Sequence, residues 1–397
     1  MVYFCALIGL FSFCQEFVYS ALEPRYAVNM QRGINTCYAS AALQAFIASR
    51  DWRDFILNFA LQGCAEVDYD KNAVSRLQEV INDYLVNASG IRLPVKKVNV
   101  IPLYQYLQSV GKMESCSFDD ALKFIKYLDQ AVRKIGPESE QGEIGRCSLE
   151  ALFYTYSVVK TFIMEKSVVS GEDKYEEDTF IMLNMPSEDR PITLSEAINH
   201  SFINFIGNEA EQRRYLIHRP RILCFDIALK NYQEQYRQSG ITIPQKMDLT
   251  PWRWTGTTDW FHPEPEWPPY RLVSVVFINV TGRTQHYVAC VRYGKTWYLC
   301  NDLDSAIKCP EIKNFERDMT INGYITLDVW GKMIPTVCIY EQIEPIIGSG
   351  RAQPKQISST SPLTSSREKH GQESELRYNS SRETMINLQN ELSLMAL

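Results

Sequence analysis

The hydrophobic pattern changes its period about halfway along the chain, and this change restricts the folds open to it. Between residues 41 and 134, apolar residues recur three and four positions apart, as on one face of a helix, in three groups: Trp52, Phe55, Ile56 and Phe59; Leu77, Val80, Ile81, Tyr84 and Leu85; and Ala121, Leu122, Ile125 and Leu128. From residue 221 onward, β-branched and aromatic residues fill runs typical of strands, at 221–227, 270–280, 287–293 and 296–300. Helices followed by antiparallel strands predict an α+β fold.

Two local signals place ends of elements. Thr193-Leu194-Ser195-Glu196 has the pattern of a capping box and predicts the start of a helix. Tyr293-Gly294-Lys295 predicts a hairpin turn between the last two strand runs.

The composition is that of a soluble, core-forming protein. The chain has 397 residues, of which 45% are hydrophobic and 22% charged. Its eleven cysteines are odd in number, and none stand in C-x-x-C spacing, which argues against a disulfide framework and a thiolate zinc site and predicts a reducing compartment. The net charge of −6 offers no basic field for nucleic acid.

The two ends differ from the middle. Residues 2–14 form an apolar run that is too short for a membrane helix, and two interpretations stay open: the core of a signal peptide, which lacks the usual Lys or Arg before it, or an additional buried helix. Residues 348 to about 382 are polar and predict a disordered tail. We therefore expect a leader over 1–28, a globular domain over 29–347 and a tail over 348–397, with no membrane association.

Cys37 is a candidate nucleophile. It stands where the turn at residues 33–36 passes into a helical pattern, and a thiol at a helix N-terminus is expected to have a lowered pKa. The alternative is a small buried cysteine that fills core space.

A cysteine nucleophile needs a base, and the chain has only five histidines. His286 begins a strand after the loop at residues 281–285, which would leave its imidazole at a sheet edge. Asn301 and Asp302 follow the neighbouring strand of the hairpin, where either could orient that imidazole. The alternative is that this pair only starts a turn.

These residues resemble the ubiquitin-specific proteases, a family of papain-like deubiquitinases. The family's cysteine motif, N-x-G-N-T-C-Y-x-N-S-x-L-Q, is matched by residues 35–38 and by Leu43-Gln44. Its histidine motif is matched in order by Tyr270, Leu272, Gly282, His286, Tyr287, Trp297, Asn301 and Asp302. Segments at 120–125, 220–232 and 243–249 resemble the family's intervening motifs, so that the resemblance spans about residues 29–343.

The resemblance implies a helical thumb that carries Cys37, an antiparallel β palm that carries His286, Asn301 and Asp302, and β fingers. It implies hydrolysis of an isopeptide or peptide bond at the C-terminal glycine of ubiquitin or a related modifier, through a thioester and without a cofactor. Tyr287 and Trp297 would wall the channel for the modifier's tail, although aromatic residues in strands are more often core. Ubiquitin, its relatives and their conjugates would be the partners.

Several positions depart from the family pattern. Arg32 stands in place of the family's oxyanion-stabilising Asn, so Arg32 and the neighbouring Gln31 are the candidate oxyanion donors. The metal-binding cysteines of the family's fingers are absent, which predicts fingers without zinc. Two functions stay open: an active thiol deubiquitinase, favoured because Cys37, His286 and Asn301 are all retained, and a weak or inactive scaffold that binds ubiquitin.

The expected location is cytoplasmic or nuclear, with secretion as the alternative if residues 1–20 are a signal peptide. Four glycosylation sequons begin at Asn87, Asn199, Asn279 and Asn379, although such triplets arise often by chance. A glycan on Asn279 would stand beside the loop before His286. The oligomeric state is not predicted by the sequence.

Overall fold

A computed structural model describes residues 22–33, 36–58, 69–91, 94–112, 121–134, 155–163, 168–185, 190–206, 210–227, 240–255, 267–279, 286–328 and 331–343. The chain divides into a compact unit, Met1–Pro345, and a second unit, Ile346–Leu397, and all described residues lie in the first. Of the predicted leader only residues 22–28 are described, and the predicted tail lies outside the described residues. Within the described part, every helix falls short of the length and apolar character that a membrane crossing requires.

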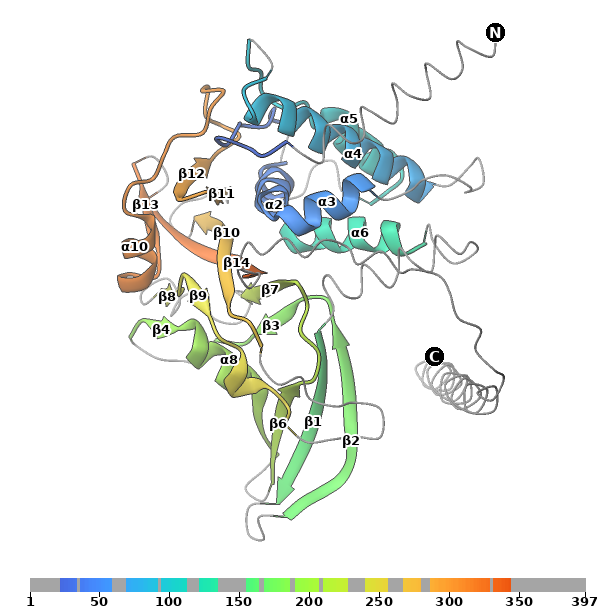
Figure 1. The fold of residues 1–397 in the computed structure, drawn as a ribbon, viewed down its shortest axis with the longest axis vertical. Coiled ribbons are helices and arrows are strands. Elements are labelled where there is room, and N and C mark those ends of the chain that lie inside the picture. Colours follow the sequence, from blue (N-terminus) through green and yellow to red (C-terminus); the bar gives the residue numbers. More distant parts are fainter. Residues whose placement is uncertain are drawn as a thin grey trace, which may run out of the picture. The chain divides into compact units, whose positions relative to one another are not determined.

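The predicted α+β fold is confirmed, with the first helices gathered in one layer (Figure 1). This helical layer consists of α2 (Cys37–Ala48), α3 (Arg50–Asn58), α4 (Tyr69–Ala88), α5 (Ile101–Ser109) and α6 (Ala121–Lys134). The apolar stripes in the sequence account for it, because the stripes on α4 and α6 are buried against their neighbours.

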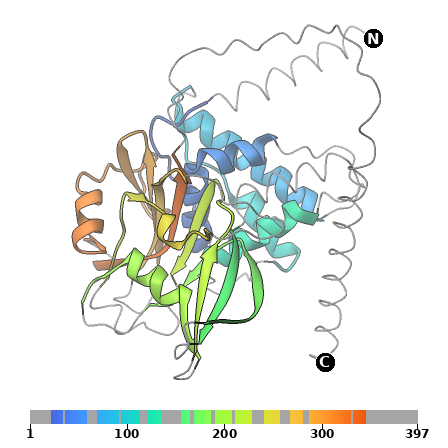
Figure 2. The ribbon, with the colours of Figure 1, turned by 60° about the horizontal axis from the view of Figure 1, so that its bottom comes forward.

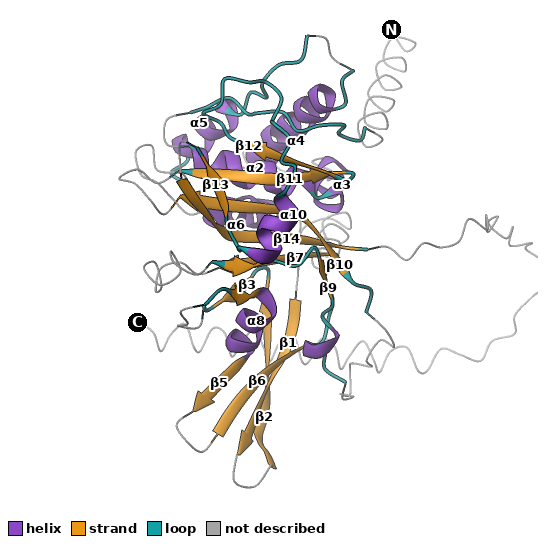
Figure 3. Cartoon of the chain, turned by 90° about the vertical axis from the view of Figure 1, so that its left-hand side faces the viewer, coloured by secondary structure: helices purple, strands orange, loops and turns teal. Residues whose placement is uncertain are grey.

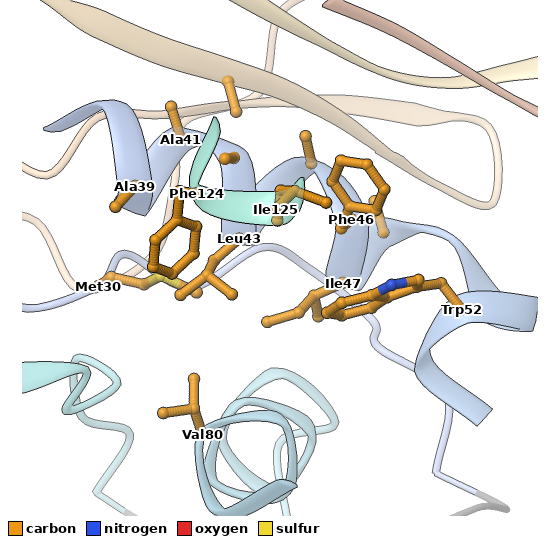
Figure 4. Close-up of a cluster of buried hydrophobic side chains, with 14 of the residues drawn as sticks. Met30, Ala39, Ala41, Leu43, Phe46, Ile47, Trp52, Val80, Phe124 and Ile125 are labelled. Atoms are coloured by element: carbon orange, nitrogen blue, oxygen red, sulfur yellow. The ribbon is translucent and has the colours of Figure 1, made fainter. Parts of the chain in front are cut away.

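Helix α2 is the centre of this layer. All twelve of its residues are buried, which fits its run of alanines between larger side chains. Leu43, Phe46 and Ile47 of α2 meet Val80 of α4 and Phe124 of α6 in one apolar cluster (Figure 4). A helix that is buried on every side has little freedom to shift, so its first residue is held firmly.

The helical layer packs on an eight-stranded sheet. Its main path runs β12-β11-β10-β14-β7-β3, with β13 paired to β14 and β9 to β10. The strands are β3 (Ile181–Leu183), β7 (Ile222–Ile227), β9 (Lys246–Met247), β10 (Tyr270–Asn279), β11 (Tyr287–Tyr293), β12 (Thr296–Cys300), β13 (Ile325–Leu327) and β14 (Gly331–Gln342). The four strands expected from the sequence are present, and Gly294 takes a φ of 62° in the predicted hairpin turn. The pairs of this sheet are antiparallel except one, in which β3 runs parallel to β7.

A second sheet of four strands extends away from the first (Figure 2). Its order is β2-β1-β6-β5, from β1 (Thr155–Ile163), β2 (Val168–Asp178), β5 (Ile203–Ile206) and β6 (Ala210–Leu216). Helix α8 (Leu194–Phe202) precedes β5 and starts with the predicted capping box, in which Thr193 Oγ1 accepts from the Glu196 N–H and the Glu196 carboxylate accepts from the Thr193 N–H. The remaining short elements are β4 (Ile192–Thr193), which pairs with β8 (Ile241–Thr242), and the 3₁₀ turn η1 (Thr250–Trp252).

The large sheet has a core on each face. Ala289, Val291 and Cys300 belong to the cluster shared with the helical layer, whereas their neighbours Val288, Cys290 and Trp297 belong to a second cluster. That second cluster is covered by α10 (Phe315–Ile321), on the face away from α2 (Figures 1 and 3). Alternate residues of one strand therefore have different environments, as the period of two requires.

Candidate active site

Cys37 is the first residue of α2. The Ser40 N–H donates to the Thr36 carbonyl at 2.9 Å, which closes the first turn of the helix. The thiol lies at the junction of α2 and β11, where it accepts a hydrogen bond from the backbone N–H of Tyr287. The expected location of this cysteine at a helix start is confirmed.

His286 immediately precedes β11 and is only 3% exposed. Its backbone N–H donates to Asn279 Oδ1 at 2.6 Å, and its carbonyl accepts from the Asn279 N–H at 3.1 Å. These two bonds join the end of β10 to the start of β11 and fix the histidine backbone. The loop between them, residues 280–285, lies outside the described residues.

Asn301 follows β12 and faces the imidazole. The Oδ1 atom of Asn301 lies 2.9 Å from Nε2 of His286 and also accepts from the Leu303 N–H at 3.1 Å. Because the second bond identifies this atom as the amide oxygen, Nε2 of the imidazole must carry the proton that it donates. Nδ1 is then the nitrogen that can accept a proton in the neutral ring.

Asp302 is 8% exposed. Its strongest influences are electrostatic: burial raises the pKa of Asp302, while the nearby His286 and Arg32 lower it. The Ser40 hydroxyl, which lies 3.1 Å from the Tyr104 hydroxyl, also lowers this pKa.

The pKa of the Cys37 thiol is raised, which corrects the expectation that the helix start lowers it. The thiol is largely removed from water, and the cost of desolvating a thiolate outweighs the hydrogen bond from Tyr287. The negative charge of Asp302 raises the pKa further. In this arrangement the thiol is protonated at neutral pH.

The pKa of His286 is lowered, chiefly by burial and in smaller part by the positive charge of Arg32. The hydrogen bond to Asn301 and the charge of Asp302 oppose this shift. A neutral imidazole beside a protonated thiol is suited to accept the thiol proton at the moment of attack.

The two candidate oxyanion donors stand just before α2. Gln31 is half-buried, and its backbone N–H donates to the Val98 carbonyl at 2.8 Å. Arg32 is exposed, yet its charge acts on the pKa values of both His286 and Asp302.

The structure separates the two aromatic residues expected beside the channel. Tyr287 is half-buried and follows His286 directly, with its backbone against the Cys37 thiol. Trp297 is 3% exposed and stacks on Phe315 of α10 with ring centroids 4.0 Å apart, in the core on the other face of the sheet. Trp297 is therefore not brought to Cys37.

Sequence reasoning missed two polar groups at the site. Asn279 holds the histidine backbone, and Tyr104 of α5 joins Ser40 in the buried pair beside Asp302. The first had a signal, because Asn279 stands near the end of a strand run, among the apolar residues of 275–280. Among the described residues, no group of three or more His, Cys, Asp and Glu side chains is arranged to hold a metal ion.

Comparison with known proteins adds one finding at the level of the family. Residues 28–326 match the family model of ubiquitin carboxyl-terminal hydrolases, a span that contains all eight candidate site residues. No individual curated protein matches the chain.

Proposed function

The chain belongs to the ubiquitin carboxyl-terminal hydrolase family, and we propose that it is an active, thiol-dependent deubiquitinase. It would hydrolyse isopeptide and peptide bonds at the C-terminal glycine of ubiquitin or a ubiquitin-like modifier. The observation that carries the proposal lies at the start of β11: the Cys37 thiol accepts a hydrogen bond from the backbone N–H of Tyr287, and the preceding residue, His286, has its Nε2 hydrogen-bonded to Asn301. That bond directs the basic nitrogen, Nδ1, away from Asn301 and leaves it for the thiol.

In the proposed reaction, Nδ1 of His286 takes the proton of Cys37 as the sulfur attacks the glycine carbonyl carbon. The imidazolium then gives that proton to the leaving amine, and a thioester remains. Water, which gives a proton to His286 acting as base a second time, then attacks the thioester carbonyl; the C–S bond breaks, the modifier leaves with a free carboxyl group, and the imidazolium returns the proton to the Cys37 sulfur. Asn301 keeps the ring in one orientation throughout, and the charge of Asp302 stabilises the imidazolium.

The negative charge that develops on the carbonyl oxygen needs donors. Gln31 and Arg32 are the proposed hydrogen-bond donors, because they stand six and five residues before Cys37 in the sequence. A guanidinium would bring a full positive charge to this position, where the family pattern has a neutral amide. The substitution would therefore alter the electrostatics of the step and not merely the donor.

The proposal is tested with ubiquitin that carries a C-terminal electrophile. We expect one covalent adduct on the wild-type protein and none on Cys37→Ala. A matched control is Cys224→Ala, because Cys224 is another buried free thiol, on β7, and its removal should leave labelling intact.

A second function is favoured by one observation, the raised pKa of the Cys37 thiol. A scaffold that binds the modifier without cleaving it would show saturable, reversible binding and no adduct, and this result would exclude the enzyme. Labelling that survives Cys37→Ala would exclude Cys37 as the nucleophile.

We also propose a cytoplasmic or nuclear location. Two of the four sequon asparagines, Asn87 and Asn279, are buried, and the Asn279 side chain holds the His286 backbone. A glycan at either position is incompatible with this packing. N-terminal sequencing of the natural protein tests the alternative, because removal of residues 1–20 would indicate secretion.

A further inference from the structure

Asn29 is a fully buried polar residue in the extended segment that leads to Cys37. Its exposed fraction is 0%, and its neighbours Val28 and Met30 are buried as well. The segment lies between two others, with Val28 bridged to Lys308 on one side and Met30 to Val98 on the other. An amide in such a position costs free energy unless both of its ends are hydrogen-bonded.

The side-chain amide of Asn29 forms hydrogen bonds, through both its oxygen and its nitrogen, with residues in and next to the turn that carries Asn301. The Oδ1 atom accepts from the Asn301 N–H at 3.1 Å and from the Cys309 thiol at 3.2 Å. The Nδ2 group donates to the Ala306 carbonyl at 2.9 Å. The backbone N–H of Asn29 adds a bond of 2.8 Å to the Ile307 carbonyl.

The turn at residues 301–306 also has bonds of its own, which set its shape. The Asp304 N–H donates to the Asn301 carbonyl at 3.0 Å, and the Leu303 N–H to Asn301 Oδ1 at 3.1 Å. These local bonds do not determine where the turn lies relative to α2. The Asn29 side chain bonds both ends of the turn to the segment before α2, beside the bond from the Cys309 N–H to the Ala27 carbonyl and that from the Lys97 ammonium to the Asp304 carbonyl.

We propose that Asn29 is a positioning residue that fixes the Asn301 turn, and through it the His286 imidazole, relative to Cys37. The proposal rests on the proposed function, in which Asn301 orients the catalytic base. The side chain of Asn29 bonds residues 301, 306 and 309, and none of these bonds is to the Cys37 thiol.

The chemical consequence follows from the bond between Asn301 and His286. If the turn moves, the buried Nε2–H loses its acceptor at Asn301, and the imidazolium loses a stabilising partner. The hydrogen bond that His286 Nε2–H donates to Asn301 raises the pKa of His286, so its loss lowers that pKa. A displaced ring also accepts the thiol proton less readily.

The test compares Asn29→Ala with Asn87→Ala. Asn87 is a matched control, because it is also 0% exposed and uses both ends of its amide, donating to the Asp83 carbonyl at 2.7 Å and accepting from the Lys96 N–H at 2.9 Å. Two readouts are taken on the full chain: the rate of labelling by the ubiquitin electrophile and the His286 pKa, from NMR titration of the imidazole.

For Asn29→Ala we expect a fall in labelling rate of about 10²-fold, the effect of a misplaced catalytic group, together with a lower His286 pKa. For Asn87→Ala we expect the wild-type His286 pKa and a rate within about threefold of wild type, even where the protein is equally destabilised. A folded Asn29→Ala protein with the wild-type rate, or with an unchanged His286 pKa, would overturn the proposal.

If Asn29→Ala does not fold, Asn29→Asp takes its place. The aspartate keeps an acceptor for the Asn301 N–H but puts a carboxylate oxygen against the Ala306 carbonyl. We expect its labelling rate to fall at least tenfold below that of Asn87→Asp, and equal rates would overturn the proposal. The NMR titration needs no ubiquitin. A wild-type protein that is never labelled would therefore contradict the proposed function while the His286 pKa still decides the role of Asn29.

Discussion

The two sides of the candidate site are built by different means. On the helical side, Cys37 begins a helix whose residues are all buried, most of them in one apolar cluster, so that packing holds the helix that carries the thiol. On the sheet side, His286 and Asn301 lie just outside the ends of β11 and β12. The backbone N–H of His286 donates to Asn279 and that of Asn301 to Asn29, while the Asn301 side chain accepts from the Leu303 N–H.

This difference teaches that stability and activity should respond to different substitutions. An apolar truncation on the helical side removes contacts and leaves a cavity, which is a cost in folding free energy. The loss of a polar group on the sheet side leaves the core intact but moves or unpairs a catalytic group. The comparison fails if apolar truncations and polar substitutions lower stability and activity to the same extent.

The largest expected effect belongs to the base. His286→Ala should lower kcat/KM for a fluorogenic ubiquitin substrate by about 10⁴-fold, because His286 is the proposed acceptor of the thiol proton. His200→Ala is the control, since His200 is exposed in the last turn of α8. A variant that retains more than a tenth of the wild-type kcat/KM would remove His286 from the mechanism.

Truncation on the helical side should act on folding instead. Phe46→Ala should lower the free energy of unfolding by about 3–5 kcal/mol, because Phe46 is 0% exposed and meets Trp52 and Phe180 edge-to-face. Urea denaturation measures this loss, while kcat/KM of the folded fraction should stay within about threefold. Phe205→Ala is the control, since Phe205 is 61% exposed and its loss should change stability by about 0.5 kcal/mol or less.

Substitutions of the two oxyanion candidates, Gln31 and Arg32, should differ in the loss of kcat that they cause and in their effect on the pH profile of kcat/KM. If Arg32 supplies the donor, Arg32→Ala should cost about 10²–10³-fold in kcat, and Gln31→Ala much less. Loss of Arg32 also removes a charge that lowers the pKa of His286, so the acid limb of kcat/KM should move to higher pH. A full loss of rate in Gln31→Ala, with Arg32→Ala near wild type, would reverse the assignment.

The smallest expected effect is on stability and concerns Glu341, which joins the large sheet to the helical layer by hydrogen bonds. Glu341 of β14 accepts at one oxygen from the Ser49 hydroxyl and from the Asp51 N–H, both at 3.0 Å, and burial raises its pKa above the usual 4.5. Between 4.5 and this raised pKa the folded protein binds more protons than the unfolded chain. Lowering the pH through that range should therefore stabilise the wild type through Glu341.

Glu341→Gln keeps an oxygen for both donors and cannot titrate. The stability of the wild type relative to this variant should therefore rise as the pH falls from 7.5 to 5, as measured by urea denaturation at each pH. A difference that stays constant, or that shrinks as the pH falls, would contradict the raised pKa.

Much of the fold was predictable because its periods are clear. The stripes of α3, α4 and α6 and the runs of β7, β10, β11 and β12 were all found, as was the capping box at Thr193. Strands β5 and β14 were not predicted, and β6 was missed because Ala210–Leu216 is mostly polar and only its last residue is buried. Such a strand is specified by its neighbours more than by its own residues.

The candidate site was predictable where a motif carried it and unpredictable where only packing did. Cys37, His286 and Asn301 were selected through their spacing; in the structure the His286 ring is hydrogen-bonded to Asn301, and the Cys37 thiol to the backbone of Tyr287, the next residue. The direction of the Cys37 pKa shift was wrong, because burial is invisible in a local pattern. Asn29 gave no warning beyond one amide in an apolar segment.

The position of β14 determines when the large sheet can be completed during synthesis of the chain. This strand, Gly331–Gln342, comes last in the sequence of the sheet yet lies between β10 and β7 in space. Until residue 342 has left the ribosome, β10 and β7 lack the strand that joins them, and the large sheet stays in two parts. The nascent chain therefore carries its nucleophile for some 300 residues of synthesis before the sheet that holds the base is complete.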